Sequence, residues 1–244
     1  MQLFGHRGAA GEAPENTIAG IRHAIERGVR NVEIDLRLSA DKQIVIVHDN
    51  NAKRTAGINR QIARLTASEL NQLDARKSGT PWPRKMGCGI PTLRRYLSNS
   101  PEIQRYQLEV KLDKSSEHAL MIEKIGALFP SKASTKKIVI TSFDYDFLAK
   151  LRQQFPYIPI GAISYKTNAL ATAKQLGCEY FCINTAIAKP QFIKKIRETD
   201  MHLSVWTVNN PEQIKALYEL KVDSIISDYP SMALPLINSL KRKK

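Results

Sequence analysis

The sequence lacks any long apolar run, and none of its stretches approaches the roughly 20 apolar residues that a membrane-spanning helix needs. It has only three cysteines, Cys88, Cys178 and Cys182, without the spacing of a disulfide framework. No second Cys or His pair completes a zinc-binding set with them. These absences argue against an integral membrane protein, a disulfide-stabilised secreted domain and a structural zinc site. We expect buried thiols in a reducing compartment.

Acidic residues are also few: Asp and Glu number 23 against 37 Lys and Arg, which gives a formal charge of +14. A positive balance attracts anionic partners, namely nucleic acid, anionic lipid surfaces or phosphorylated small molecules, and charge alone does not choose among them. Much of the excess falls on expected helices, where a solvated basic surface accounts for it. The first basic cluster, at His6 and Arg7, begins so near Met1 that we expect no signal peptide and a cytoplasmic location.

Strand-like and helix-like segments alternate along the 244 residues. Helical periodicity is expected over 16–27, 117–129, 145–155, 168–176, 190–198, 211–220 and 231–240. Barrel-type strands are expected near Leu3, Val32, Leu108, Ile138, Ile160, Phe181, Leu203 and Ile225. Eight alternating β and α units in a chain of this length favour a closed (β/α)₈ TIM barrel, an α/β fold, over an open doubly wound sheet. We therefore interpret residues 1–244 as one barrel domain.

Residues 49–105 interrupt this alternation, because they contain no barrel-like strand. A capping box at Thr66 and Glu69 predicts a helix over 68–73, a loop follows at 79–83, and a short helix ends at Leu97. We interpret the segment as a small inserted subdomain that follows the second barrel strand and its hairpin, over the catalytic mouth. It is strongly basic and would attract an anionic headgroup, a lipid surface or only water; its basic residues are Lys53, Arg54, Arg60, Arg64, Arg76, Lys77, Arg84 and Lys85.

Three carboxylates are expected at the ends of neighbouring strands. Glu33 and Asp35 lie two apart in the second strand, so both side chains point in one direction, and Glu109 lies in the third strand. The carboxyl ends of barrel strands converge on the functional face of the fold. Oxygen ligands without cysteine favour a hard cation, Mg²⁺ or Ca²⁺, over zinc, and the ligand set alone does not choose between those two ions.

Basic side chains flank these carboxylates. His6 and Arg7 end the first strand, His48 ends the hairpin, and Lys111 follows Glu109 in the third strand. A lone histidine or a lone carboxylate–lysine pair is more often structural, but their combination at strand ends favours a site. Arginine and lysine suit phosphate oxygens, and a histidine pair supplies the base and the acid for displacement at phosphorus. Which histidine is the base stays open.

Ordered motifs extend this pattern over essentially the whole chain: His6-Arg7-Gly8, Pro14-Glu15-Asn16-Thr17, Glu33-Ile34-Asp35, His48-Asp49 with Arg54-Thr55, Ile90-Pro91-Thr92-Leu93, Glu109-Val110-Lys111, Ser142-Phe143, Trp206-Thr207-Val208-Asn209 and Ser227-Asp228-Tyr229-Pro230. Together they resemble the signature of the glycerophosphodiester phosphodiesterase family, in its cytoplasmic bacterial type. The resemblance implies a (β/α)₈ barrel with a small insertion after the second strand. It also implies hydrolysis of glycerophosphodiesters to sn-glycerol 3-phosphate and an alcohol.

Residue by residue, the resemblance implies a Ca²⁺ or Mg²⁺ ion on Glu33, Asp35 and Glu109, an acid/base pair of His6 and His48, and phosphate contacts from Arg7 and Lys111. Glu15 and Asn16 match a motif that either braces the first loop or contacts the substrate. Trp206 either packs against the glycerol carbons or is a core aromatic at the barrel mouth. One family route uses the glycerol 2-hydroxyl as an internal nucleophile, which is entropically favourable. Arg94 departs from the acidic residue of many relatives.

The leading hypothesis is therefore a metal-dependent enzyme that acts on glycerophosphocholine or glycerophosphoethanolamine. A lysophospholipase D-type enzyme on the same barrel is the second reading, but it requires a membrane-binding element, and no Trp- or Phe-rich amphipathic helix is expected. A non-catalytic nucleic-acid-binding protein is the third reading, and it leaves the carboxylates unexplained. We expect no nucleic-acid partner and no stable membrane insertion. The headgroup and the oligomeric state stay open.

Overall fold

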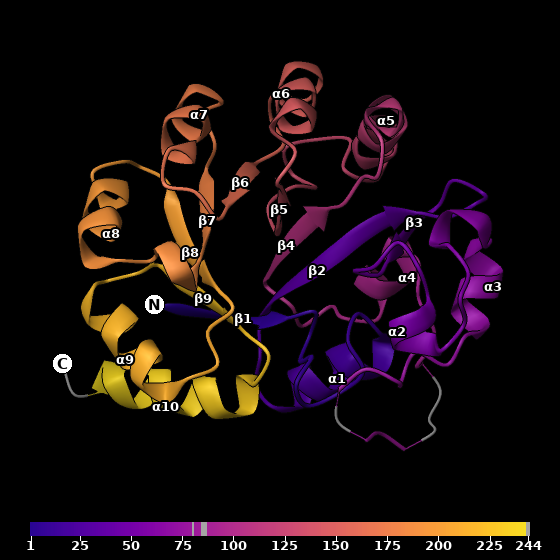
Figure 1. Ribbon diagram of the computed structural model, residues 1–244, viewed down its shortest axis with the longest axis horizontal. Helices are drawn as coiled ribbons and strands as arrows, with labels where there is room; N and C mark the ends of the chain where they lie inside the picture. Colours follow the sequence, from indigo (N-terminus) through magenta and orange to yellow (C-terminus); the bar gives the residue numbers. More distant parts are fainter. Residues whose placement is uncertain (80, 84–86, 243–244) are drawn as a thin grey trace.

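The computed structural model describes residues 1–79, 81–83 and 87–242 (Figure 1). Thr80 of the expected loop, and Arg84 and Lys85 of the basic set, lie outside the described residues. Within the described ranges, no helix combines the length and the apolar character needed to cross a membrane. The side chains of Cys88, Cys178 and Cys182 are buried, as expected.

In the described part of the chain, eight parallel strands close into a barrel. They pair in the order β1-β9-β8-β7-β6-β5-β4-β2, and pairing of β1 with β2 completes the circle. Their bounds are β1 Gln2–His6, β2 Asn31–Leu38, β4 Arg105–Val110, β5 Ile138–Ser142, β6 Ile160–Ser164, β7 Tyr180–Asn184, β8 His202–Trp206 and β9 Ser224–Ser227. Each contains the position at which the sequence predicts a barrel strand, so the closed barrel is confirmed.

Helices cover the outside of this barrel (Figure 1). They are α1 Ile18–Glu26, α4 Leu93–Ser98, α5 His118–Leu128, α6 Tyr145–Gln154, α7 Ala169–Gln175, α8 Pro190–Arg197, α9 Pro211–Glu219 and α10 Pro230–Arg242. Short 3₁₀ turns, η2 Ser115–Glu117 and η3 Thr185–Ile187, precede α5 and α8. The apolar stripes of the helices pack on the strands, and one large core of buried aliphatic and aromatic side chains results.

The first helix begins later than the sequence predicts. Asn16 has a positive φ of 56°, so it cannot continue a right-handed helix. The hydroxyl of Thr17 accepts a hydrogen bond from the backbone N–H of Gly20 at 2.9 Å and caps the helix instead. The helix expected over 16–27 is therefore Ile18–Glu26, and the residues before it are free to form a loop beside the pocket.

The hairpin strand β3 (Ile44–Ile46) runs antiparallel to β2, with Leu36 opposite Ile46. After it come α2 Lys53–Ala56, η1 Ile62–Arg64 and α3 Ala67–Gln72, the last with the predicted capping box between Thr66 and Glu69. Their buried residues form a second apolar cluster, separate from the main core. Leu93 and Tyr96 of α4 belong to the main core, so α4 serves as the barrel helix between β2 and β4. On this basis we propose that residues 49–105 contain a small inserted subdomain, with α4 on its barrel side.

Candidate active site

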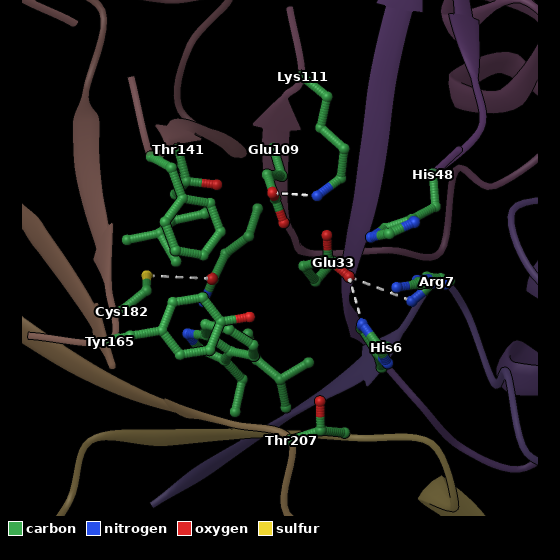
Figure 2. A pocket seen from close by; sticks show the side chains of 15 residues that line it. His6, Arg7, Glu33, His48, Glu109, Lys111, Thr141, Tyr165, Cys182 and Thr207 are labelled. Atoms are coloured by element: carbon green, nitrogen blue, oxygen red, sulfur yellow. Dashed lines mark hydrogen bonds and ion pairs between the residues drawn. The ribbon is translucent and has the colours of Figure 1, made fainter. Parts of the chain in front are cut away.

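A pocket opens where the barrel strands end (Figure 2). Its charged side carries His6, Arg7, Glu33, His48, Glu109 and Lys111, and its other side carries Thr141, Phe143, Ile163, Tyr165, Cys182 and Trp206. The structure thus brings six of the predicted polar residues and Trp206 to one cavity. Asp35, Glu15 and Asn16 are buried beside it and do not line it. Strand register explains the convergence, because His6 pairs with Glu33 and Asp35 pairs with Glu109.

Glu33, Asp35 and Glu109 each present one carboxylate oxygen within 4.8 Å of the others. Burial, and then the charge of Asp35, raise the pKa of Glu33 and of Glu109. Oε1 of Glu33 is buried and has no hydrogen-bond partner among the described residues. Two buried carboxylates and a half-buried third that repel each other, one with an unpartnered oxygen, fit a hard divalent cation with oxygen ligands.

Two cationic side chains stand beside these carboxylates. Nε of Arg7 lies 3.2 Å from Oδ2 of Asp35, and Nζ of Lys111 lies 3.3 Å from Oδ1 of the same residue. Lys111 also donates to Oε1 of Glu109. Burial tends to raise the pKa of Asp35, but the charges of Arg7 and Lys111 outweigh it and hold that pKa well below its usual range. Asp35 is therefore ionised, and both cations line the pocket where an anion could meet them.

Each pocket histidine is hydrogen-bonded to a carboxylate through Nδ1. Nδ1 of His6 lies 2.6 Å from Oδ1 of Asp228, and Nδ1 of His48 lies 2.7 Å from Oδ1 of Asp49. Nε2 of His6 faces Glu33 and lies 3.7 Å from its Oε2. A carboxylate on Nδ1 fixes the tautomer and the ring orientation, so that Nε2 is the nitrogen available for proton transfer.

The two histidines differ in charge environment. Burial lowers the pKa of His6, but the hydrogen bond to Asp228 and the charge of Glu33 outweigh it, so this pKa is raised. Burial also lowers the pKa of His48, and the nearby cations Arg7 and Lys111 reinforce the effect against the charge of Asp35. Environments that move two titratable groups in opposite directions are typical of an acid/base pair.

Glu15 and Asn16 brace the site from behind. Oε1 of Glu15 accepts a hydrogen bond from Nη1 of Arg7 at 2.9 Å. The side-chain amide of Asn16 donates to Oδ2 of Asp35 at 2.8 Å, and its oxygen accepts from the Asp35 backbone N–H at 3.4 Å. This geometry favours the bracing role over direct substrate contact.

An aromatic group forms the other side of the pocket. The rings of Phe143 and Tyr165 stack at 5.3 Å, and Trp206 meets them edge-on at 5.8 and 5.0 Å. Phe143 is 42% exposed and Tyr165 is 58% exposed, whereas Trp206 packs on the buried cluster of Val139, Ile163, Tyr180 and Cys182. Trp206 therefore packs on the core and also lines the pocket. A core aromatic in this position is compatible with packing against a substrate.

Sequence reasoning assigned no individual role in the site to six residues, although all but Tyr165 lie in the ordered motifs and Arg54 belongs to the basic segment. These residues are Asp49, Arg54, Asp228, Asn209, Phe143 and Tyr165. A local signal existed for Asp49, which follows His48 directly. Asp228 directly follows β9, and its approach to His6 depends on the closure of the barrel. Arg54 reaches the site through Glu15 and Asp49, a contact between segments that no spacing in the sequence reveals.

Comparisons with known proteins show the family to which the chain belongs. The family model described as the glycerophosphoryl diester phosphodiesterase family matches residues 6–232. The chain is 28% identical to a putative glycerophosphodiester phosphodiesterase, YhdW, of Bacillus subtilis over 241 residues, which cover 96% of this chain and 97% of that protein. It is 24% identical to the lysophospholipase D GDPD1 of Rattus norvegicus, over 96% of this chain and 85% of that protein.

A solved structure extends the likeness to three dimensions. An Oleispira antarctica phosphodiesterase, in complex with the product sn-glycerol-3-phosphate, superposes with a TM-score of 0.84 at 25% identity. The match covers 98% of this chain and 97% of that one. Together with the family match, it confirms the resemblance that the ordered motifs indicate. The chain belongs to the glycerophosphoryl diester phosphodiesterase family and is a phosphoric diester hydrolase.

Proposed function

We propose that the protein hydrolyses glycerophosphodiesters, such as glycerophosphocholine and glycerophosphoethanolamine, to sn-glycerol 3-phosphate and an alcohol with the help of one divalent cation. The observation that carries the proposal is the convergence of Glu33, Asp35 and Glu109 at the pocket, beside two histidines that each hold a carboxylate on Nδ1. The product bound by the Oleispira antarctica relative supports the glycerol phosphate half of the substrate.

Glu33, Asp35 and Glu109 would hold the ion, Mg²⁺ or Ca²⁺. When bound, it would neutralise charge that develops on the phosphate oxygens. Arg7 and Lys111 bind the remaining oxygens, and the planar fork of Arg7 suits two of them at once. The salt bridges of both residues with Asp35 hold them in place before a substrate arrives.

His6 and His48 divide the proton transfers between them. One accepts the proton of the attacking hydroxyl at Nε2, and the other donates a proton from Nε2 to the oxygen of the leaving alcohol. We further propose that the attacking group is the glycerol 2-hydroxyl, because an internal nucleophile needs little additional ordering. Its attack displaces the alcohol and leaves a cyclic glycerol phosphate. The histidine that gave its proton to the alcohol then takes one from water, which opens the ring, and the other histidine returns its proton to the 2-oxygen to give sn-glycerol 3-phosphate. Trp206 would then pack against the glycerol carbons and hold that hydroxyl near phosphorus.

A coupled assay for sn-glycerol 3-phosphate tests this function. The purified protein is given glycerophosphocholine or glycerophosphoethanolamine, first with EDTA and then with Mg²⁺ or Ca²⁺ restored. We expect product with a restored ion and little with EDTA. Product that is unaffected by EDTA would contradict the cation, and the absence of product with either ion would contradict the substrate class.

A second candidate is lysophospholipase D activity on the same site. The exposed rings of Phe143 and Tyr165 favour it, because an apolar surface beside the charged half suits a substrate with an acyl chain. The similarity to a lysophospholipase D supports it as well. The test is choline release from lysophosphatidylcholine below its micellar concentration, compared with release from glycerophosphocholine. A Phe143→Ala variant should lose more activity on the lysolipid than on glycerophosphocholine.

A further inference from the structure

Arg54 of α2 lies outside the barrel but binds two carboxylates that belong to the pocket region. Its Nη1 and Nη2 donate to Oε2 and Oε1 of Glu15 at 2.6 and 2.8 Å, a two-pronged contact. Its Nε donates to Oδ2 of Asp49 at 2.7 Å. The planar guanidinium thus joins the two carboxylates and fixes their relative orientation, whereas the ammonium group of a lysine lacks the planar fork for a two-pronged contact.

Each of the two carboxylates also contacts a residue that lines the pocket. Oε1 of Glu15 also accepts from Nη1 of Arg7 at 2.9 Å, so two guanidinium groups share this carboxylate. Oδ1 of Asp49 holds Nδ1 of His48 at 2.7 Å. Arg54 is therefore connected through Glu15 to Arg7, a proposed phosphate contact, and through Asp49 to His48, a proposed acid/base residue.

We propose that Arg54 is a positioning residue that aligns Arg7 and His48 with each other, so that the segment between β3 and β4 sets phosphate binding and proton transfer together. The inference rests on the proposed function, because it takes Arg7 as a phosphate contact and His48 as a proton-transfer group. Arg54 itself touches neither the pocket nor the carboxylates that would hold the ion.

The burial of Glu15 separates its pairing with Arg54, whose own side chain is 42% exposed, from an ordinary surface ion pair. The side chain of Glu15 is 6% exposed and has two cationic partners, so the loss of Arg54 leaves one of its buried oxygens unpaired. The pair of Arg60 and Glu69 in the same segment is the contrasting case: its atoms are 3.9 Å apart, and its side chains are 54% and 48% exposed. Such an exposed pair contributes little. Arg60→Met is therefore a matched control for Arg54→Met.

The test measures kcat on glycerophosphocholine and, separately, the Kd of the probe sn-glycerol 3-phosphate by calorimetry with Mg²⁺ present. Glu15→Gln should weaken probe binding more than it lowers kcat, whereas Asp49→Asn should lower kcat more than it weakens probe binding. Arg54→Met should affect both quantities, each by about 10- to 100-fold, as supporting residues around metal sites do. Arg60→Met should change neither.

Double variants separate positioning from general loss of structure. Arg54→Met added to Glu15→Gln should weaken probe binding no further, and added to Asp49→Asn it should lower kcat no further, because each pair acts through one contact. Arg54→Lys keeps the charge without the planar fork; it should fold with an unchanged melting temperature and still lose part of both quantities. This variant carries the test if Arg54→Met does not fold.

Two results would overturn the inference. The first is an Arg54→Met or Arg54→Lys protein that behaves like Arg60→Met. The second is a further loss of probe binding when Arg54→Met is added to Glu15→Gln, or a further loss of kcat when it is added to Asp49→Asn. In either case, the wild-type protein still turns over substrate and binds the probe. A wild-type protein that does neither would instead refute the proposed function, and the inference would fail with it.

Discussion

Oδ1 of Asp228 lies 2.6 Å from Nδ1 of His6, although 222 positions separate the two residues in the sequence. The contact exists because β9 pairs with β1 as the barrel closes, with Gly5 opposite Ser227. Asn209 holds Asp228 in turn, through a 2.6 Å hydrogen bond to Oδ2. The last strand of the barrel therefore completes the environment of the first histidine.

Asp228→Asn should lower kcat by about 10- to 100-fold without unfolding the protein, since it replaces the charged carboxylate that orients His6 with a neutral amide. A p-nitrophenyl ester of glycerol phosphate shows which proton transfer is affected, because its leaving group needs no protonation. If His6 is the acid, the defect shrinks with this ester; if His6 is the base, it persists. Asp49→Asn should show the reciprocal pattern through His48. Wild-type turnover by Asp228→Asn on both substrates would rule out the positioning of His6.

His6→Ala and His48→Ala should each reduce turnover by about 10²- to 10⁴-fold, the usual range for an acid or base in proton transfer. Circular dichroism and thermal melting should show an unchanged fold. Near-wild-type turnover by either variant would refute the acid/base assignment of that histidine.

Glu109→Gln should raise the concentration of Mg²⁺ or Ca²⁺ needed for half-maximal turnover, because a neutral amide is a weaker ligand than a carboxylate. Titration of each ion into EDTA-treated enzyme measures the shift. Glu179→Gln is a suitable control, since Glu179 pairs with Arg152 away from the pocket. An identical ion requirement in Glu109→Gln and the control would exclude Glu109 as a ligand.

Glu33 should make the stability of the ion-free protein depend on pH. Burial, and then the charge of Asp35, raise the pKa of Glu33 above its ordinary value of 4.5. The folded state therefore holds the proton more tightly than the unfolded state, and stability is lost as the pH rises above 4.5 toward the folded pKa. In EDTA, Glu33→Gln should melt at a higher temperature than the wild-type protein at pH 8. A lower melting temperature for the variant in EDTA would contradict this reading.

His202 should make the stability of the protein depend on pH in the opposite sense. It lies at the other end of β8, far from the pocket. Burial lowers its pKa to about 4 from 6.5. Its ring stacks on Tyr180 at 4.3 Å, and its Nε2 lies 2.9 Å from the hydroxyl of Ser224. The unfolded state binds the proton first, so the stability that the neutral ring contributes is present above pH 6.5 and is lost as the pH falls toward 4. The free energy of unfolding in urea should decline less over this range in His202→Gln than in the wild-type protein. If the free energy of unfolding declined equally in both proteins, groups other than His202 would be responsible for the pH dependence.

The strands and the charged half of the site were predictable because their signals are local. Two carboxylates at strand spacing, such as Glu33 and Asp35, must point in one direction, and parallel strands must end at one face. The roles assigned to these residues stay predictions, but the structure does bring their side chains together. The start of α1 was predicted too early, because the apolar stripe does not reveal that Asn16 adopts a positive φ.

The remaining features depend on contacts between distant segments. The pairing of Asp228 with His6 requires closure of the barrel, and the contact of Arg54 with Glu15 requires α2 to pack beside the first loop. The stacking of Phe143 on Tyr165 joins the ends of two strands. None of these contacts follows from a fixed spacing or period in the sequence, so they could not be predicted from one sequence.

The two sides of the pocket come from different parts of the chain. The proposed ligands of the ion and of the phosphate all precede residue 112, whereas Phe143, Tyr165 and Trp206 follow it. We therefore expect substitutions in the loops after β5 and β6, which carry Phe143 and Tyr165, to alter which groups on the glycerol are accepted while the phosphate contacts are preserved. A library confined to those loops is accordingly the economical starting point for retargeting the enzyme to new diesters.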